Sequence, residues 1–287
     1  MTPQERFIMS PGITLIPSNP KHIHYEANKV GKDYIVGDLH GCIDDLMCAL
    51  ELIKFNFVND RLFSVGDLID RGPHSIKTAR LMYEPWMHPV RGNHEQLMID
   101  TMLNDPHSGS AGIWFNNGGV WRFDHQDDEL RSLARDALAL PLVISVGDGL
   151  ERFNIVHAEL THRELIDGYM QPVLITDESI DNWVFDEHDE LAMLWGRQLI
   201  RSGTRRQFHD VSLSPTYAGH TIVIQPTMAE NHIYIDTGAM NHHYNKNKSE
   251  ANCLTIAEPN QKLVHCFSMM HRTIETNHID TLLKFCQ

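Results

Sequence analysis

The chain has 287 residues, enough to bury a substantial core within one domain, since α/β folds of this size often form a single unit. Its formal net charge of -14 disfavours a nucleic-acid partner, which is normally bound by a basic stripe. The five cysteines form no CxxC pair, and the sequence has neither a signal-like N-terminus nor an apolar run of about 18 residues, so we expect a cytoplasmic protein that makes no membrane contact.

The first half of the chain alternates strand and helix patterns. Residues 1–31 contain four prolines and no clear hydrophobic period, which predicts an N-terminal extension before a single domain over residues 32–287. Strands are predicted within residues 32–37, 61–67 and 87–93, separated by helical patterns. Because this spacing suits strand-helix-strand crossovers, we expect a parallel sheet.

Helices are then predicted over residues 95–103 and 127–141, with a packed glycine-rich loop at residues 114–121 between them. The second half is β-rich, with short apolar runs separated by turn residues, and it predicts a second sheet. Residues 168–200 read as mixed helix and loop.

Three polar motifs each begin where an apolar run stops. They are GDLHG at residues 37–41, GDLIDRGP at residues 66–73 and RGNHE at residues 91–95. Ligands of open parallel sheets bind in the crevice beyond the carboxyl ends of the strands, where such loops converge. Each motif alone would be a weak signal, but three of them at crossover spacing predict a functional site at this sheet edge.

The motifs offer a set of metal ligands without thiolate. Oxygen and imidazole donors suit Mn, Fe or Zn in an open catalytic site rather than a closed structural zinc site. The set is larger than one ion needs, so two divalent ions bridged by a carboxylate are predicted. The candidate ligands are Asp38, His40, Asp67, Asn93, His157 and His220, of which the two last follow strand patterns in the second half.

Further side chains suit phosphoester hydrolysis in such a centre. A water activated by the ions to hydroxide would attack phosphorus in line. His94 is placed to protonate the leaving group, and Asp70 to hold that imidazole. Arg71 and Arg197 are candidates for the phosphate oxygens, although for Arg197 a surface ion pair is equally compatible with its Trp195-Gly196-Arg197 context.

With these motifs intact, the chain resembles the calcineurin-like metallophosphoesterases, specifically the phosphoprotein phosphatase branch with its GDxHG, GDxxDRG and GNHE signatures. The resemblance covers roughly residues 32–268 and includes Gly219-His220-Thr221. The NGG-aromatic stretch at residues 117–121 is similar to one in the bacterial and phage-lambda-type serine/threonine phosphatases.

The resemblance implies a two-sheet β-sandwich flanked by helices, with a binuclear site, most often loaded with manganese, at the strand ends. Asp67 bridges the two ions by this resemblance, His94 is the general acid with Asp70 as its partner, and Asn93 contacts phosphate as well as metal. One departure from the family pattern is Glu159, where many relatives have glycine. We expect its carboxylate to lie near the second metal.

Three functions follow from this reading. The leading one is hydrolysis of phosphoserine or phosphothreonine in proteins. The alternative within the same superfamily is hydrolysis of dinucleoside tetraphosphates, a branch whose second motif typically lacks the aspartate that stands here as Asp70. A third possibility, from another class, is a catalytically silent module that binds phosphoproteins, but such modules should have lost ligands.

Overall fold

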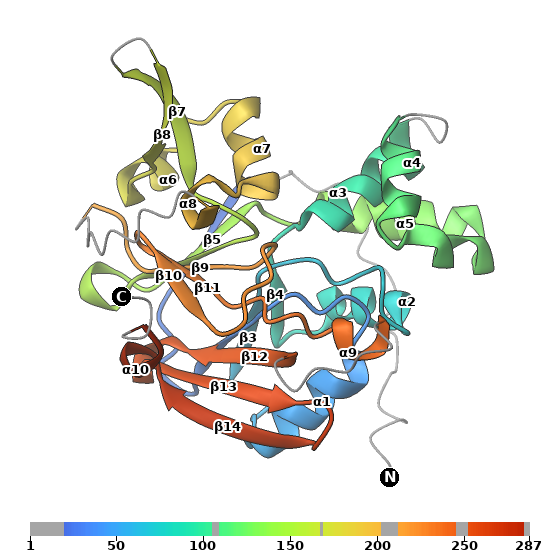
Figure 1. Cartoon of the computed structure of the whole chain (residues 1–287), viewed down its shortest axis with the longest axis horizontal. Helices are drawn as coiled ribbons and strands as arrows, with labels where there is room; N and C mark the ends of the chain where they lie inside the picture. The colour runs from blue at the N-terminus through green and yellow to red at the C-terminus, as the bar shows by residue number, and fades with distance from the viewer. Residues whose placement is uncertain (1–19, 105–108, 167–168, 202–211, 245–251, 284–287) are drawn as a thin grey trace.

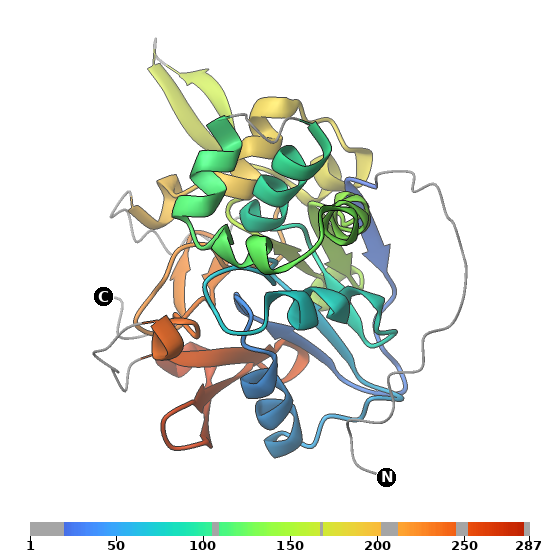
Figure 2. The ribbon, with the colours of Figure 1, turned by 90° about the vertical axis from the view of Figure 1, so that its right-hand side faces the viewer.

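A computed structural model describes residues 20–104, 109–166, 169–201, 212–244 and 252–283. Two six-stranded sheets form its centre (Figure 1). One has the order β14-β13-β12-β2-β3-β4, and the other the order β1-β5-β6-β9-β11-β10. A separate two-stranded sheet, β7-β8, projects from the fold in both views (Figure 1, Figure 2).

The first six-stranded sheet contains the predicted parallel strands. The strands β2 (Asp33–Val36), β3 (Arg61–Ser64) and β4 (Met87–Pro89) pair in parallel, and antiparallel strands from the C-terminal part extend the sheet. These added strands are β12 (Cys253–Glu258), β13 (Leu263–Ser268) and β14 (Thr273–His278). The prediction of a parallel sheet with strand ends at the three motifs is confirmed.

The second sheet combines strands from three parts of the chain. Its strands are β1 (His22–Tyr25), β5 (Val143–Val146), β6 (Phe153–Val156), β9 (Thr216–Ala218), β10 (Thr227–Ala229) and β11 (His232–Tyr234). The strands β6, β9 and β11 run parallel to one another. Their carboxyl ends therefore meet at one edge, as do those of the first sheet.

The two sheets pack face to face, because alternate residues of each strand point to opposite faces. Ile35 of β2 and Phe63 of β3 join Ile144 of β5 and Ile155 of β6 in a core between the sheets. Tyr34, one residue before Ile35, packs instead in a core on the outer face of its sheet. The predicted two-sheet sandwich flanked by helices is confirmed.

Helices cover both outer faces (Figure 1, Figure 2). On the first sheet lie α1 (Ile43–Leu52), α2 (Ser75–Ala79), α3 (Asn93–Ile99) and α5 (Asp127–Leu138), whose apolar residues share a core with Tyr34 and Leu62. On the second sheet lie α6 (Asp177–Asn182), α7 (Glu187–Trp195) and α8 (Gln198–Arg201), packed against Val143, Val156 and Tyr234. Two further short helices are α9 (Asn241–Tyr244) and α10 (Ile279–Leu283).

Several local predictions were wrong. Residues 22–25, assigned to the extension, form β1, which pairs with β5. Of residues 114–121, predicted as a loop, only 117–118 form a turn; the others lie in α4 (Gly109–Asn116) and the 3-10 helix η4 (Gly119–Asp124). The segment read as helix and loop also includes β8 (Tyr169–Leu174), which pairs with β7 (Thr161–Ile166). The domain boundary at residue 32 stays a prediction, since residues 1–19 lie outside the described part.

Within the described ranges, no helix combines the length and the apolar character needed to cross a membrane.

Candidate active site

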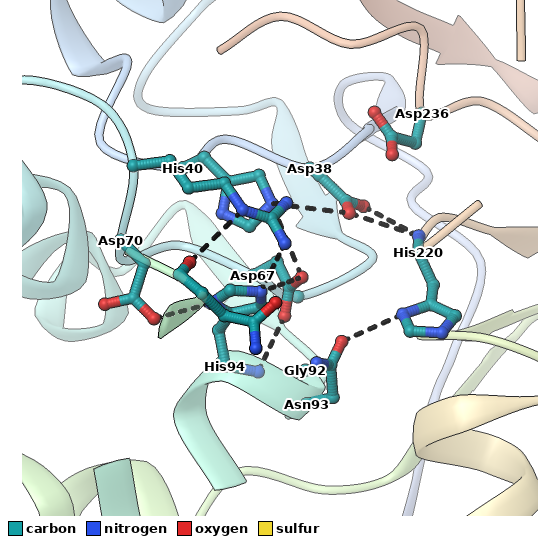
Figure 3. A network of polar contacts seen from close by, with 12 residues as sticks. Asp38, His40, Asp67, Asp70, Gly92, Asn93, His94, His220 and Asp236 are labelled. Carbon is teal, nitrogen blue, oxygen red and sulfur yellow. Dashed lines mark hydrogen bonds and ion pairs between the residues drawn. The ribbon is translucent and has the colours of Figure 1, made fainter. Parts of the chain in front are cut away.

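The three motif loops converge beyond the carboxyl ends of β2, β3 and β4. Figure 3 shows Asp38 and His40 from the first loop, Asp67 and Asp70 from the second, and Asn93 and His94 from the start of α3. All six side chains are buried. The order of the parallel strands brings together residues that are separated by more than fifty positions in the chain, as the sequence predicted.

A buried glutamate fixes the central loop. The carboxylate of Glu95 accepts hydrogen bonds from the backbone N–H groups of Asp67 (2.9 Å), Leu68 (2.9 Å) and Gly92 (2.9 Å). These bonds tie the loop after β3 to the start of α3. Burial, together with the charge of Asp67, raises the pKa of Glu95 to about 7.

The site backbone is unusual at five residues. Non-glycine residues rarely adopt a positive φ, because the Cβ atom then crowds the backbone. Such outliers cluster where the surrounding structure holds the chain for a functional reason. Here the five are His40 (φ 41°), Asp67 (φ 52°), Asp70 (φ 75°), Arg71 (φ 66°) and His220 (φ 63°).

Asp67 lies between two groups of donor atoms. Its Oδ2 is 3.5 Å from Nε2 of His40, and Nε2 of His40 is 4.0 Å from Oδ2 of Asp38. Its other oxygen, Oδ1, is 3.4 Å from Nε2 of His157. The two oxygens of one carboxylate thus face two different sets of side chains, which is the arrangement expected of a bridging ligand.

The second group is completed by Asn93. Its Oδ1 lies 2.7 Å from Nε2 of His157 and 2.9 Å from Nδ1 of His220. His157 follows β6 and His220 follows β9, so both imidazoles come from the second sheet. One ligand atom each of Asp67, His157 and His220 lies within 4.8 Å of the others, and the same holds for Asp67, His40 and His94.

Backbone carbonyls fix two of these imidazoles. Nδ1 of His40 donates to the carbonyl of Ile69 (2.8 Å), and Nδ1 of His157 donates to that of Val65 (2.7 Å). Each Nε2 is therefore an unprotonated acceptor directed into the site. Burial lowers the pKa of both imidazoles, which keeps them in the neutral form that metal binding requires.

The donor set fits divalent cations. Burial and the neighbouring charges of Asp236 and Asp67 raise the pKa of Asp38, so the site crowds carboxylates that a cation would stabilise. Nδ1 of His220 faces Asn93 in this donor group, while its Nε2 is buried without a hydrogen-bond partner among the residues that the structure describes. Binding at His40 needs one rearrangement, because Nη1 of Arg71 lies 2.6 Å from its Nε2. Arg71 is only partly buried and can turn aside.

His94 and Asp70 form a buried pair beside Asp67. Nδ1 of His94 is 2.5 Å from Oδ2 of Asp70. Burial lowers the pKa of His94, but Asp67 and Asp70 outweigh it, so the net pKa is raised. Asp70 also accepts from the indole N–H groups of Trp114 (3.0 Å) and Trp121 (2.6 Å). The predicted pairing is thus present, with two tryptophans the sequence interpretation did not assign to the site.

Both predicted arginines lie at the site. Nη2 of Arg71 is 2.9 Å from Nε2 of His94. Nη1 of Arg197 donates to the hydroxyl of Thr221 (3.3 Å), next to His220. Burial, followed by the charge of Arg201, lowers the pKa of Arg197, while the carboxylates of Asp38 and Asp236 oppose this shift. Arg197 therefore lies within electrostatic reach of these two carboxylates, and both its contact with phosphate and the alternative of a surface ion pair stay predictions.

The expectation for Glu159 was wrong. Its carboxylate is fully buried and accepts from the backbone N–H groups of Gln198 and Leu199 and from the hydroxyl of Tyr234. The side chain is therefore directed toward the start of α8 and not toward the candidate ligands.

Asp236 is a site residue that the sequence interpretation missed. It lies two residues beyond β11 and is buried beside Asp38 (Figure 3). Burial, and then the charge of Asp67, raises its pKa to about 6. An acidic residue just after a predicted strand was the available signal, the same one that identified Asp38 and Asp67.

Comparison with known proteins agrees with this geometry. Residues 34–223 match the family model of the calcineurin-like phosphoesterases. Serine/threonine-protein phosphatase 2 of Salmonella typhimurium is 31% identical over 211 residues, which cover 72% of this chain and 87% of that relative. The chain belongs to the calcineurin-like phosphoesterase family and is a metallophosphoesterase with serine/threonine phosphatase relatives.

Two further matches are informative. A symmetrical bis(5'-nucleosyl)-tetraphosphatase of Pseudomonas syringae pv. tomato is 48% identical, but over 64 residues that cover only 22% of this chain and 21% of that relative. A protein serine/threonine phosphatase structure from Saccharomyces cerevisiae aligns with a TM-score of 0.56 and 15% identity over 90% of this chain and 83% of its own. This second likeness concerns the fold alone.

Proposed function

We propose that the protein removes phosphate from phosphoserine or phosphothreonine of proteins, using two divalent cations, with manganese as the preferred ion. The proposal rests chiefly on one observation: the two oxygens of Asp67 face two separate sets of donor atoms, beside a buried pair of His94 and Asp70. The phosphatase relative, which spans most of this chain, supports the choice of substrate.

The proposed ligands divide around Asp67. Asp38 and His40 would hold one cation, and Asn93, His157 and His220 the other. Cations held there would lower the pKa of a water molecule and neutralise the phosphoryl oxygens. The carbonyl bonds at His40 and His157 keep their imidazoles oriented for that task.

His94 then delivers the proton to the leaving alkoxide. Its raised pKa favours the protonated imidazole, and Asp70 holds Nδ1 so that Nε2 is the atom that donates. Arg71, 2.9 Å from that Nε2, would bind a phosphoryl oxygen, as would Arg197. The amide of Asn93 is placed to contact phosphate as well.

Hydrolysis of dinucleoside tetraphosphates remains the second candidate, favoured by the short tetraphosphatase match. Asp70 opposes it, because that branch typically lacks an aspartate before Arg-Gly and here this aspartate is bound to His94. The silent module is disfavoured by the complete set of candidate ligands.

The free cysteines Cys42, Cys48, Cys253 and Cys266 fit the proposed cytoplasmic location.

A direct test compares phosphoserine and phosphothreonine peptides with diadenosine tetraphosphate, each assayed with added Mn, Fe, Zn and Mg. We expect the highest kcat/KM on a phosphopeptide with Mn, and loss of activity after chelation. Faster turnover of the dinucleotide would move the assignment to the second candidate. Absence of bound metal after reconstitution, with phosphopeptide binding retained, would favour the silent module.

A further inference from the structure

We propose that Glu159 is a positioning residue for Arg197. It holds the guanidinium of Arg197 at the phosphate and does not itself touch the substrate. This inference rests on the proposed function, in which Arg197 binds a phosphoryl oxygen. Glu159 lies two residues after His157, a candidate ligand, while Arg197 lies 38 residues further along the chain. Their connection is therefore made by the fold.

The carboxylate of Glu159 holds the backbone directly after Arg197. Its Oε2 accepts from the N–H of Gln198 (2.8 Å), and its Oε1 from those of Leu199 (3.0 Å) and Ile200 (3.3 Å). The N–H of Gln198 belongs to the same rigid peptide plane as the carbonyl of Arg197. Fixing that N–H therefore fixes the backbone direction from which the Arg197 side chain departs.

The carboxylate is itself held in place. Tyr234 of β11 donates its hydroxyl to Oε1 at 2.9 Å, and Glu159 is fully buried. The backbone N–H groups of Ala158 and Glu159 donate to the carbonyls of Met193 (2.8 Å) and Ala192 (3.3 Å) near the end of α7. Glu159 thus bonds to the chain on both sides of the turn formed by Trp195, Gly196 and Arg197.

This turn packs directly on Glu159. A Cβ atom at Gly196 would lie 2.9 Å from Cβ of Glu159 and 2.5 Å from the carbonyl oxygen of Ala192, so only glycine fits without displacement. The ring of Trp195 meets that of His220 edge to face, with the ring centroids 5.9 Å apart. The turn is therefore fixed between Glu159 and a candidate metal ligand, and Arg197 is its last residue.

Glu159→Gln is the most selective change. It preserves the volume and one oxygen, but it replaces an acceptor of backbone N–H groups by a donor. The backbone N–H groups that face the new amide group lose their acceptor, so the turn at residues 195–197 should become less rigid. Arg197 would then remain present but less well oriented.

The test is a double-mutant cycle of Glu159→Gln and Arg197→Ala, read by calorimetric binding of inorganic phosphate to the Mn-loaded protein and by phosphopeptide kinetics. Residues that act through one another show non-additive effects. We expect Glu159→Gln to weaken phosphate binding by about tenfold when Arg197 is present, and by less than about twofold in the Arg197→Ala background. Equal losses in both backgrounds would overturn the proposal.

Asp60→Asn provides a matched control. The Asp60 carboxylate also accepts two backbone N–H groups, those of Lys32 and Asn56, each at 2.8 Å. It lies near the start of β3, whereas the site is beyond the strand's other end. We expect this change to lower the thermal midpoint and leave phosphate affinity unchanged. If Glu159→Gln behaved in the same way, its role would be structural only and the proposal wrong.

A second variant tests the same proposal if Glu159→Gln folds poorly. Gly196→Ala pushes the turn away from Glu159 and should give the same Arg197-dependent loss of phosphate affinity; an Arg197-independent loss would overturn the proposal.

Phosphate binding also separates this inference from the proposed function. A wild-type protein that binds phosphate through Arg197 but hydrolyses no phosphomonoester overturns the function alone. Turnover with an additive cycle, or turnover without measurable phosphate binding, overturns the role of Glu159 alone, and absence of both phosphate binding and turnover in the metal-loaded protein overturns both.

Discussion

Two buried glutamates, Glu95 and Glu159, hold loops on either side of the candidate site, and the loops differ in what they carry. Glu95 binds the backbone of the loop that contains Asp67, the carboxylate shared by both donor groups. Glu159 binds the backbone that follows Arg197. By the roles proposed above, Glu95 supports cation binding because it holds the loop of Asp67, whereas Glu159 supports phosphate binding because it holds the backbone beside Arg197.

The largest expected effect separates these two regions by kinetics. His94→Asn removes the proposed proton donor, so kcat on phosphoserine peptides should fall by about 10²- to 10⁴-fold with little change in KM. Arg197→Ala should chiefly raise KM. An aryl phosphate needs less protonation and should be less sensitive to His94→Asn. Full activity of this variant on phosphoserine peptides would show that His94 is not the general acid.

The next effect concerns metal affinity. Glu95→Gln should weaken Mn binding by about 10- to 100-fold, because residues that support metal ligands typically have effects of this size. Glu159→Gln should leave Mn affinity unchanged. Calorimetric titration of the metal-free proteins with Mn measures both. Equal Mn affinities for the two variants would remove the distinction between the two regions.

A smaller effect is expected at Asp70. Trp121→Phe removes the N–H that Asp70 accepts at 2.6 Å, which should cost about 1 to 3 kcal/mol of stability and lower kcat on alkyl phosphates several-fold. Trp86→Phe is the control, since Trp86 packs in the aromatic core with Phe55 and Phe57, away from Asp70. Thermal unfolding and kcat measure the two consequences. An unchanged kcat in Trp121→Phe would mean that the indole does not position Asp70.

The smallest functional effect is expected at His232, in the second-sheet region. Burial lowers its pKa to about 3, and its Nε2 accepts from the N–H of Leu160. The His232 imidazole binds a proton near pH 6.5 in the unfolded chain but not in the folded chain, so its contribution to stability is fully present above that pH. As the pH falls from about 6 to about 4, this group should lower the free energy of unfolding by about 1.4 kcal/mol per pH unit.

Denaturant unfolding across this pH range tests His232→Gln. We expect a shallower fall in stability than for the wild type and unchanged activity at neutral pH. An unaltered slope would show that His232 does not titrate on unfolding.

Within the first region, the sequence predicted the candidate ligands better than the side chains that surround them, for a physical reason. Asp38, Asp67 and Asn93 follow apolar strands directly, so a local pattern places them at one sheet edge. The contacts of Trp114 and Trp121 with Asp70 cross 44 and 51 positions of the chain, and no local period reports them.

Direction was also harder to predict than proximity. Glu159 lies two residues from His157, yet the chain has left β6 at Val156, so the alternation of side chains along a strand no longer applies. Its carboxylate consequently faces α8. The strand β1 was missed because HIHY, the sequence of His22–Tyr25, has only a short and half-polar pattern that resembles a connecting segment.

The five site residues with positive φ, described above, affect which substitutions stabilise the protein. Each such conformation costs about 1 to 3 kcal/mol, so together they use free energy comparable to the roughly 5 to 15 kcal/mol that stabilises a typical domain. Glycine at any of these positions would relieve this strain while removing a functional side chain. Screening for thermostability alone should therefore enrich inactive variants such as Arg71→Gly, and selection for activity must continually act against them.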